Sequence, residues 1–158
     1  RRSAAAATDL QSGEAIIFQS GNTGTAVRAS SAIPGVFPPV GFGGREYVDG
    51  GLVAPIPARE ARSLGADIVI AVDISGRPSG KKNQGSLDVL LDTIAIMGGA
   101  LGKAELTAAD VVIRPELRGL PATNFQQRHE AILEGEKAGF AAIARVREAI
   151  AAWQRKNG

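Results

Sequence analysis

The residues with the clearest potential for chemistry are Asp49-Gly50-Gly51, which follow the short stretch Tyr47-Val48. An aspartate between a strand and two glycines can be held at the edge of a sheet, because glycine allows a sharp turn and places no Cβ near a reacting group. A carboxylate held there can act as a general base toward a neighbouring hydroxyl. Asp-Gly is also common in plain turns, which remain the alternative. If Asp49 is a base, we expect it at a strand end, on a concave surface and near residues 29–34.

The other polar residues have simpler interpretations. The fourth residue after His129 is Leu133, where a helical zinc motif needs a second histidine, and the chain has no cysteine. We therefore expect no metal and no cofactor. The glycine-rich stretches at 21–24 and 41–44 lack the spacing of phosphate-binding loops, which disfavours a nucleotide-binding domain. Three more aspartates lie next to expected strand ends, where such residues usually cap turns: Asp9, Asp67 and Asp73.

The first third of the chain predicts three kinds of local structure. A strand over 15–18 follows a turn at 11–14, which favours a hairpin. A short helix is expected over 24–33, because the residue before Pro34 is driven out of the helical region. Residues 34–51 contain three prolines and six glycines, and we expect a structured loop with many turns there.

The remainder of the chain alternates helical and strand patterns, which is typical of the α/β class. A helix over 57–64 would end at Gly65, and the unbroken apolar run 68–72 predicts a strand buried on both faces. Residues 87–106 predict a helix interrupted at Gly98-Gly99, and 111–113 predict another buried strand. The last stretch predicts a helix with one apolar face that packs on a sheet, formed by Ile132, Phe140, Ile143, Val146, Ile150 and Trp153.

Composition restricts the partners. The 158 residues have a net charge of only +2 and scattered basic residues, so we expect no nucleic-acid partner. The sequence contains no run of about 18 apolar residues, which is the length that would predict a membrane-spanning helix. The lack of cysteine suits a cytoplasmic location. Residues 75–86 form a polar loop with Arg77, Lys81 and Lys82, for which transient contact with a membrane is an alternative to simple solvation.

Several of these motifs occur together in the order found in one family. The sequence resembles patatin-like phospholipases, in particular short bacterial members and the catalytic domain of neuropathy target esterase. The resemblance covers about residues 4–74, where short motifs in a fixed order are more specific than any one of them alone. The matching stretches are Thr8–Glu14, Ala29–Pro34, Val48–Gly51, Leu64–Asp67 and Ile68–Asp73.

The resemblance implies a fold, a reaction and a set of site residues. The fold would be a three-layer α/β sandwich, and the reaction would be hydrolysis of lipid or lysolipid acyl esters by a Ser-Asp dyad without cofactor. Asp49 matches the base of the dyad. The positions that match residues shaping the site are Gly50, Gly51, Ser30 and Pro34.

The sequence departs from this family at the nucleophile. The family places the reactive serine in Gly-x-Ser-x-Gly, after a glycine-rich oxyanion loop, and no serine in these 158 residues has that flanking. The nearest pattern, around Ser79, is one residue out of register. We expect residues 1–158 to be the C-terminal part of a single hydrolase domain, partnered by an N-terminal half on a separate chain or segment and inactive alone. A non-catalytic scaffold or degenerate subunit is the alternative.

Overall fold

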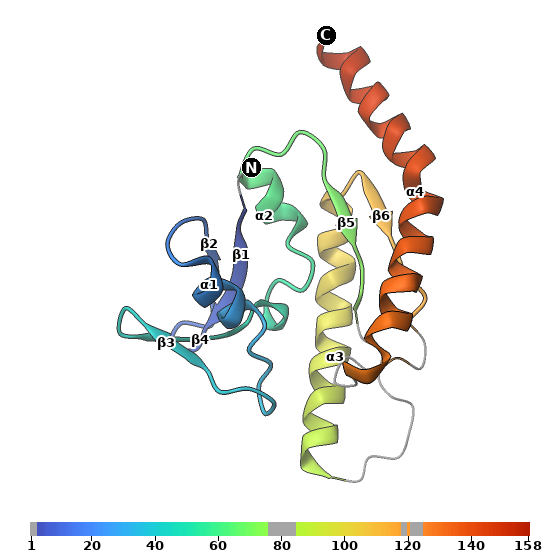
Figure 1. Cartoon of the computed structure of the whole chain (residues 1–158). Coiled ribbons are helices and arrows are strands. Elements are labelled where there is room, and N and C mark those ends of the chain that lie inside the picture. Colours follow the sequence, from blue (N-terminus) through green and yellow to red (C-terminus); the bar gives the residue numbers. More distant parts are fainter. Residues whose placement is uncertain (1–2, 76–84, 118–119, 121–124) are drawn as a thin grey trace. The chain divides into compact units, whose positions relative to one another are not determined.

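The computed structural model describes residues 3–75, 85–117, 120 and 125–158, which fall into two compact units (Figure 1). The first unit comprises residues 1–57 and 77–102, and the second comprises 58–76 and 103–158. Both contain helices and strands, which confirms the mixed α/β class. The proposal that residues 1–158 belong to a single hydrolase domain stays a prediction.

The first unit is built on a four-stranded antiparallel sheet. Its order is β2 (Ala15–Phe18), β1 (Ala5–Asp9), β4 (Arg45–Asp49) and β3 (Val40–Phe42). The first two strands form the expected hairpin, in which Ala5 pairs with Phe18. β1 also pairs with β4, and this pairing brings Ala7 opposite Asp49.

The prediction of a loop over residues 34–51 was wrong for its second half, which is the β3–β4 hairpin. Phe42 pairs with Arg45, so only Gly43 and Gly44 form the connection. Their φ angles of 61° and 75° lie in the left-handed region that a two-residue hairpin turn with right-handed strand twist requires. The high glycine content of this stretch suggested an irregular loop. Two of these glycines, Gly43 and Gly44, instead allow the tight turn of the β3–β4 hairpin.

Helix α1 (Thr23–Ser30) covers one face of this sheet. It begins at Asn22, whose Oδ1 accepts a hydrogen bond from the N–H of Thr25 at 2.9 Å, as is typical of a helix N-cap. It ends at Ser30, before the expected residue 33. Just after this end, the hydroxyl of Ser31 donates to the carbonyl of Val27 at 2.8 Å. Fully buried Ala29 packs with Ala7 in the core of the unit. Three aromatic rings extend this core, with centroids 4.4–5.3 Å apart: Phe18, Phe42 and Tyr47.

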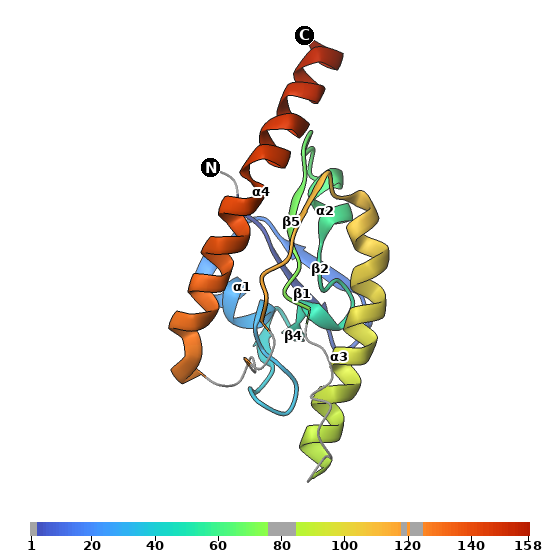
Figure 2. The ribbon, with the colours of Figure 1, turned by 90° about the vertical axis from the view of Figure 1, so that its right-hand side faces the viewer.

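Helix α3 (Ser86–Glu105) is continuous, so the predicted interruption at Gly98-Gly99 was wrong (Figure 2). A glycine inside a helix costs about 1 kcal/mol relative to alanine, which a helix of this length tolerates. A Cβ on Gly98 would lie 3.7 Å from the carbonyl oxygen of Gly51, in the short 3-10 helix η1 (Gly50–Leu52). The helix therefore approaches the Asp-Gly-Gly motif through its glycine backbone.

The second unit contains a two-stranded parallel sheet. Helix α2 (Ala58–Ser63) ends at Gly65, which has a φ of 91° as expected for a C-terminal glycine. β5 (Ile70–Val72) pairs with β6 (Val111–Ile113). The prediction that β5 is buried on both faces was wrong, because Ile70 and Val72 are 44% and 52% exposed and only Ala71 is buried. Among the described residues, β6 is the only strand that pairs with it.

Two 3-10 turns, η2 (Leu106–Ala108) and η3 (Phe125–Gln127), precede the long helix α4 (Arg128–Asn157). The helix was predicted, and it contacts β6. Its apolar face does not pack as expected, because the small residue Ala142 is buried while Ile132 and Phe140 are 58% and 72% exposed. No described helix combines the length and the apolar character needed to cross a membrane.

Candidate active site

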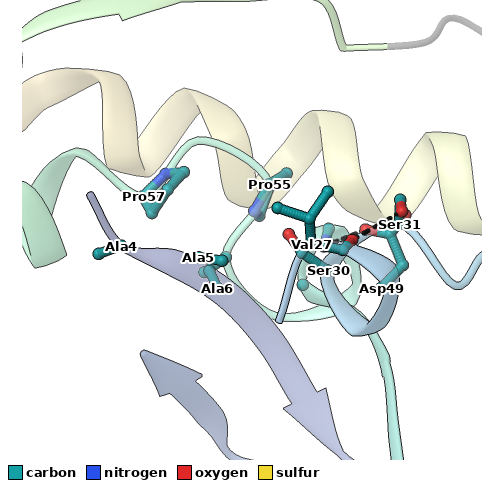
Figure 3. A pocket seen from close by; sticks show the side chains of 12 residues that line it. Ala4, Ala5, Ala6, Val27, Ser30, Ser31, Asp49, Pro55 and Pro57 are labelled. Carbon is teal, nitrogen blue, oxygen red and sulfur yellow. Dashed lines mark hydrogen bonds between the residues drawn. The ribbon is translucent and has the colours of Figure 1, made fainter. Parts of the chain in front are cut away.

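A pocket of about 440 Å³ lies within the first unit, beside the end of β4 (Figure 3). Its walls come from the start of β1, the last turn of α1, the Asp-Gly-Gly motif and the proline-containing turn at 54–57. Asp49 and Ser30 lie together toward one end, and Ala4 and Pro57 toward the other. The expected placement of Asp49, at a strand end on a concave surface near residues 29–34, is confirmed.

Asp49 is fixed by hydrogen bonds to three segments. Its backbone N–H donates to the carbonyl of Ala32 at 3.0 Å, and its own carbonyl accepts from the hydroxyl of Thr8 at 2.8 Å. Its side-chain Oδ1 accepts from the N–H of Gly51 at 2.7 Å. Within the described part of the chain, Oδ2 accepts no hydrogen bond. One carboxylate oxygen is therefore held in place and the other is open to a partner.

At each of the two glycines of the motif, a Cβ would come too close to a different neighbouring atom. A Cβ on Gly50 would lie 2.4 Å from the carbonyl oxygen of Ala6 in β1, a distance that backbone atoms cannot accommodate without moving. A Cβ on Gly51 would lie 2.9 Å from Oδ1 of Asp49. Gly50 thus allows close approach to β1, and Gly51 leaves room for the carboxylate.

The pocket raises the pKa of Asp49 above its usual value of 3.8. Burial is the larger cause, because removing water disfavours the charged form, and the hydrogen bond from Gly51 offsets part of the effect. A carboxylate with a raised pKa is a stronger base than one in water. The environment therefore favours proton acceptance at this position.

The other predicted site residues divide into two groups. Ser30 lines the pocket together with Asp49, Gly50 and Gly51. Pro34 is not among the lining residues and lies in the turn after α1. The next residue, Gly35, has a φ of 80°, and a Cβ there would come within 2.9 Å of Leu87 in α3. This turn therefore packs against α3 instead of forming a wall of the pocket.

Asp9, at the end of the neighbouring strand β1, is in a different environment. It is 1% exposed, pairs with Arg45, and accepts a hydrogen bond from the N–H of Gln11 at 2.8 Å. Burial alone would raise its pKa, but these hydrogen bonds and the positive charge outweigh burial and lower it. Asp73 likewise accepts from the N–H of Ser75 at 3.1 Å. Both aspartates cap turns, as predicted.

Several residues around the pocket were not singled out for the site by the sequence. Thr8 and Ala32 hold Asp49 through its backbone, and Pro55 and Pro57 form part of the wall. Proline spacing in 55–57 signals a rigid turn, but nothing in the sequence places that turn beside β1. The role of Ala32 is carried by its backbone carbonyl, which leaves no signal in its side-chain type.

The described residues include no group of three or more histidine and carboxylate side chains that could hold a metal ion. The out-of-register pattern around Ser79 lies outside the described residues. The polar and glycine residues that line the pocket together are thus Asp49, Ser30, Ser31, Gly50 and Gly51.

Comparison with known proteins agrees with the motifs. Residues 8–62 match the patatin-like phospholipase family, a range that includes Asp49 and most of the pocket. An NTE family protein of Mycobacterium tuberculosis is 43% identical over 76 residues, which cover 48% of this chain and 21% of that protein. A second NTE family protein from the same organism is 28% identical over 160 residues, covering 85% of this chain and 27% of that protein.

More distant matches carry a function in their names. A protein of Yarrowia lipolytica named lysophospholipase NTE1 is 25% identical over 159 residues, covering 84% of this chain and 11% of that protein. The chain therefore spans about a quarter or less of each of these relatives. Together, these matches show that residues 8–62 resemble the patatin-like phospholipase family and that the chain is similar to NTE family proteins.

Proposed function

We propose that this chain supplies the base of a Ser-Asp dyad in an acyl-ester hydrolase of the phospholipase or lysophospholipase type. Asp49 is that base, and the nucleophilic serine comes from a Gly-x-Ser-x-Gly segment outside these 158 residues. With that segment the fold would complete a three-layer sandwich. The observation that carries the proposal is the carboxylate of Asp49, held by Gly51 at the edge of a pocket with Oδ2 open.

The reaction uses the carboxylate as a proton carrier. Asp49 accepts the proton of the serine hydroxyl as the serine oxygen attacks the carbonyl carbon of the ester. The protonated Asp49 then gives this proton to the departing alcohol when the C–O bond breaks, which leaves an acyl-serine. Water repeats the sequence, with Asp49 as its base, and releases the fatty acid. A raised pKa suits both halves of this cycle, because the group must accept and return the proton.

The pocket is compatible with an acyl ester substrate. Its walls are mainly small or apolar, with Ala5, Val27 and Pro55 among them, whereas the polar groups gather around Asp49. An ester with an apolar tail would place the tail along the apolar wall and the carbonyl near the carboxylate. This division between apolar walls and few polar groups is usual in small-molecule sites.

The test uses a longer protein that joins these residues to a segment with Gly-x-Ser-x-Gly. Asp49→Asn preserves the shape of the side chain but cannot accept the proton, so hydrolysis of a p-nitrophenyl ester should fall about 10² to 10⁴-fold. Asp67→Asn is the matched control, because Asp67 does not line the pocket. Circular dichroism should show equal folding. A folded Asp49→Asn protein with near wild-type turnover would contradict the role.

A non-catalytic scaffold is the second candidate, favoured by the lack of Gly-x-Ser-x-Gly in the sequence. The two candidates differ in reaction with a fluorophosphonate, which labels activated serines. The dyad proposal expects no labelling of the 158-residue chain alone and strong labelling after the segment with the nucleophile is added. Failure of the assembled protein to label or to hydrolyse esters would favour the scaffold.

A further inference from the structure

The C-terminal half of α4 carries an apolar face that is not buried. At about 100° per residue, four side chains fall within roughly 80° of the helix circumference. These residues, which we call the α4 apolar face, are Ile143, Val146, Ile150 and Trp153. Three of the four are about 40% exposed: Ile143, Ile150 and Trp153. A continuous apolar stripe with this exposure indicates a surface that meets something other than water.

Basic residues border this face on both sides. Arg147 lies on one border, and Arg145 and Lys156 lie on the other, with Arg155 farther around the helix. Residues 143–156 contain four basic residues and one acidic residue, a net charge of +3, whereas the whole chain carries only +2. Within the described part of the chain, none of the four basic side chains pairs with a carboxylate.

The strands of its own unit leave this end of the helix uncovered. α4 packs on β6, and its one fully buried residue is Ala142, immediately before the α4 apolar face. Figure 1 shows the last turns of α4 continuing past the ends of β5 and β6. The apolar and basic side chains therefore lie on a part of the helix that the sheet of this unit does not cover.

We propose that the α4 apolar face docks on an anionic membrane surface, with the helix lying in the plane of the interface. Apolar side chains would enter the boundary between headgroups and acyl chains, and the bordering arginines and lysine would meet lipid phosphates. Arginine and lysine can extend their charged ends toward headgroups while their aliphatic parts stay near the apolar region. Tryptophan is favoured at such boundaries because its ring is apolar and its N–H is polar.

Charge complementarity selects this partner over two others. Pairing two copies through this face would bring Arg145, Arg147 and Lys156 of both copies together, and like charges oppose such contact. A nucleic acid would use the basic residues but leave the row of isoleucine and valine without a partner. An anionic lipid surface satisfies both the apolar row and its basic borders.

Trp153 provides a direct test because it is the only tryptophan in the chain. The chain is mixed with vesicles of phosphatidylcholine alone, or of equal parts phosphatidylcholine and phosphatidylglycerol. With the anionic vesicles we expect the emission of Trp153 to shift to shorter wavelength and the chain to sediment with the lipid. Both effects should weaken with added salt, because salt screens the attraction between basic residues and lipid phosphates. The readout does not involve ester hydrolysis, so it stands or fails separately from the proposed function.

Substitutions separate the apolar and charged contributions. Ile150→Ser should weaken vesicle binding at least about tenfold, and Arg147→Gln or Lys156→Gln should weaken it about fivefold each. Leu133→Ser is the matched control, because Leu133 is a half-exposed residue of the same helix that lies off the α4 apolar face. It should leave binding unchanged, and circular dichroism should show the same helix content in all variants.

Three outcomes would overturn the proposal. One is an unchanged Trp153 emission with anionic vesicles. Another is equal binding to neutral vesicles without salt dependence, which would remove the role of the basic borders. The third is a shift of emission that follows protein concentration without lipid and disappears in Ile150→Ser, which would assign the face to a second copy of the chain.

Discussion

The backbone N–H of Asp49 donates to the carbonyl of Ala32 at 3.0 Å, and this bond joins two motifs that lie far apart in the sequence. Ala32 belongs to the Ala29–Pro34 segment, which ends α1, and Asp49 ends β4. The segment therefore does more than place Ser30 at the pocket, because its backbone also holds Asp49 at the end of β4. Thr8 holds the carbonyl of the same residue from the opposite strand.

Asp49 should make the folded chain less stable at neutral pH than an uncharged residue would. Its folded pKa is raised, so its contribution to stability is fully present below the unfolded pKa and is lost as pH rises through the folded pKa. Asp49→Asn removes this loss. The free energy of unfolding of Asp49→Asn minus that of wild type should therefore be larger at about pH 7 than at about pH 3. Urea unfolding at the two pH values measures the difference.

The raised pKa of Asp49, which causes this pH dependence of stability, can be measured directly. The carboxyl carbon of Asp49, followed by NMR during a pH titration, should titrate above the usual value of 3.8. A titration at or below that value, together with no pH dependence of the stability difference, would show that burial does not control the charge of Asp49.

Asp9 should show the opposite sign, because its folded pKa is lowered. Its contribution is present above the unfolded pKa and is lost as pH falls through the folded pKa. Asp9→Asn should therefore unfold at lower urea concentration than wild type at neutral pH, and the difference should shrink in acid. The same denaturation series serves both aspartates. Equal pH profiles for the two variants would show that the Arg45 and backbone hydrogen bonds of Asp9 do not control its charge.

The sequence predicted the parts of this site that depend on local patterns. A strand followed by Asp-Gly-Gly placed Asp49 correctly, and the motif at 29–34 predicted its neighbour Ser30. The β3–β4 hairpin was missed because glycine-rich loops and two-residue glycine turns have the same composition. The roles of Thr8 and Ala32 were missed because they act through contacts between residues distant in sequence. The apolar run 68–72 predicts a strand that needs covering neighbours on both faces but does not say which residues supply them, and Ile70 is exposed in this chain.

Gly50→Ala should destabilise the first unit. Its added Cβ would lie 2.4 Å from the carbonyl oxygen of Ala6, so β1 or η1 must move. Overpacking of this kind costs about 1–3 kcal/mol in free energy of unfolding. Gly99→Ala is the matched control, since nothing lies within 4 Å of a Cβ there and the site is helical. It should stabilise by up to about 1 kcal/mol. A thermal unfolding scan that gave the two variants the same sign would contradict the close approach of Gly50 to β1.

Gly51→Ala should alter the carboxylate of Asp49 more than the fold. Gly51 has no positive φ, so alanine suits its backbone, but its Cβ would lie 2.9 Å from Oδ1 of Asp49. The carboxylate must move, which weakens the 2.7 Å hydrogen bond from the N–H of residue 51. Because that bond lowers the pKa of Asp49, weakening it should raise this pKa further in an NMR titration. In the assembled hydrolase, displacement of a reacting group by about 1 Å can cost about 10²-fold in rate.

Thr8→Val separates this local effect from a general loss of structure. The substitution removes the hydroxyl that donates to the carbonyl of Asp49 at 2.8 Å, and Thr8 is buried. Its loss should cost about 1–3 kcal/mol in free energy of unfolding, because the carbonyl loses a buried donor. The donor acts on the backbone of Asp49 and not on its carboxylate, so the pKa of Asp49 should change less than in Gly51→Ala. If Thr8→Val raised that pKa as much as Gly51→Ala did, the hydrogen bond from Gly51 would not be what tunes the carboxylate.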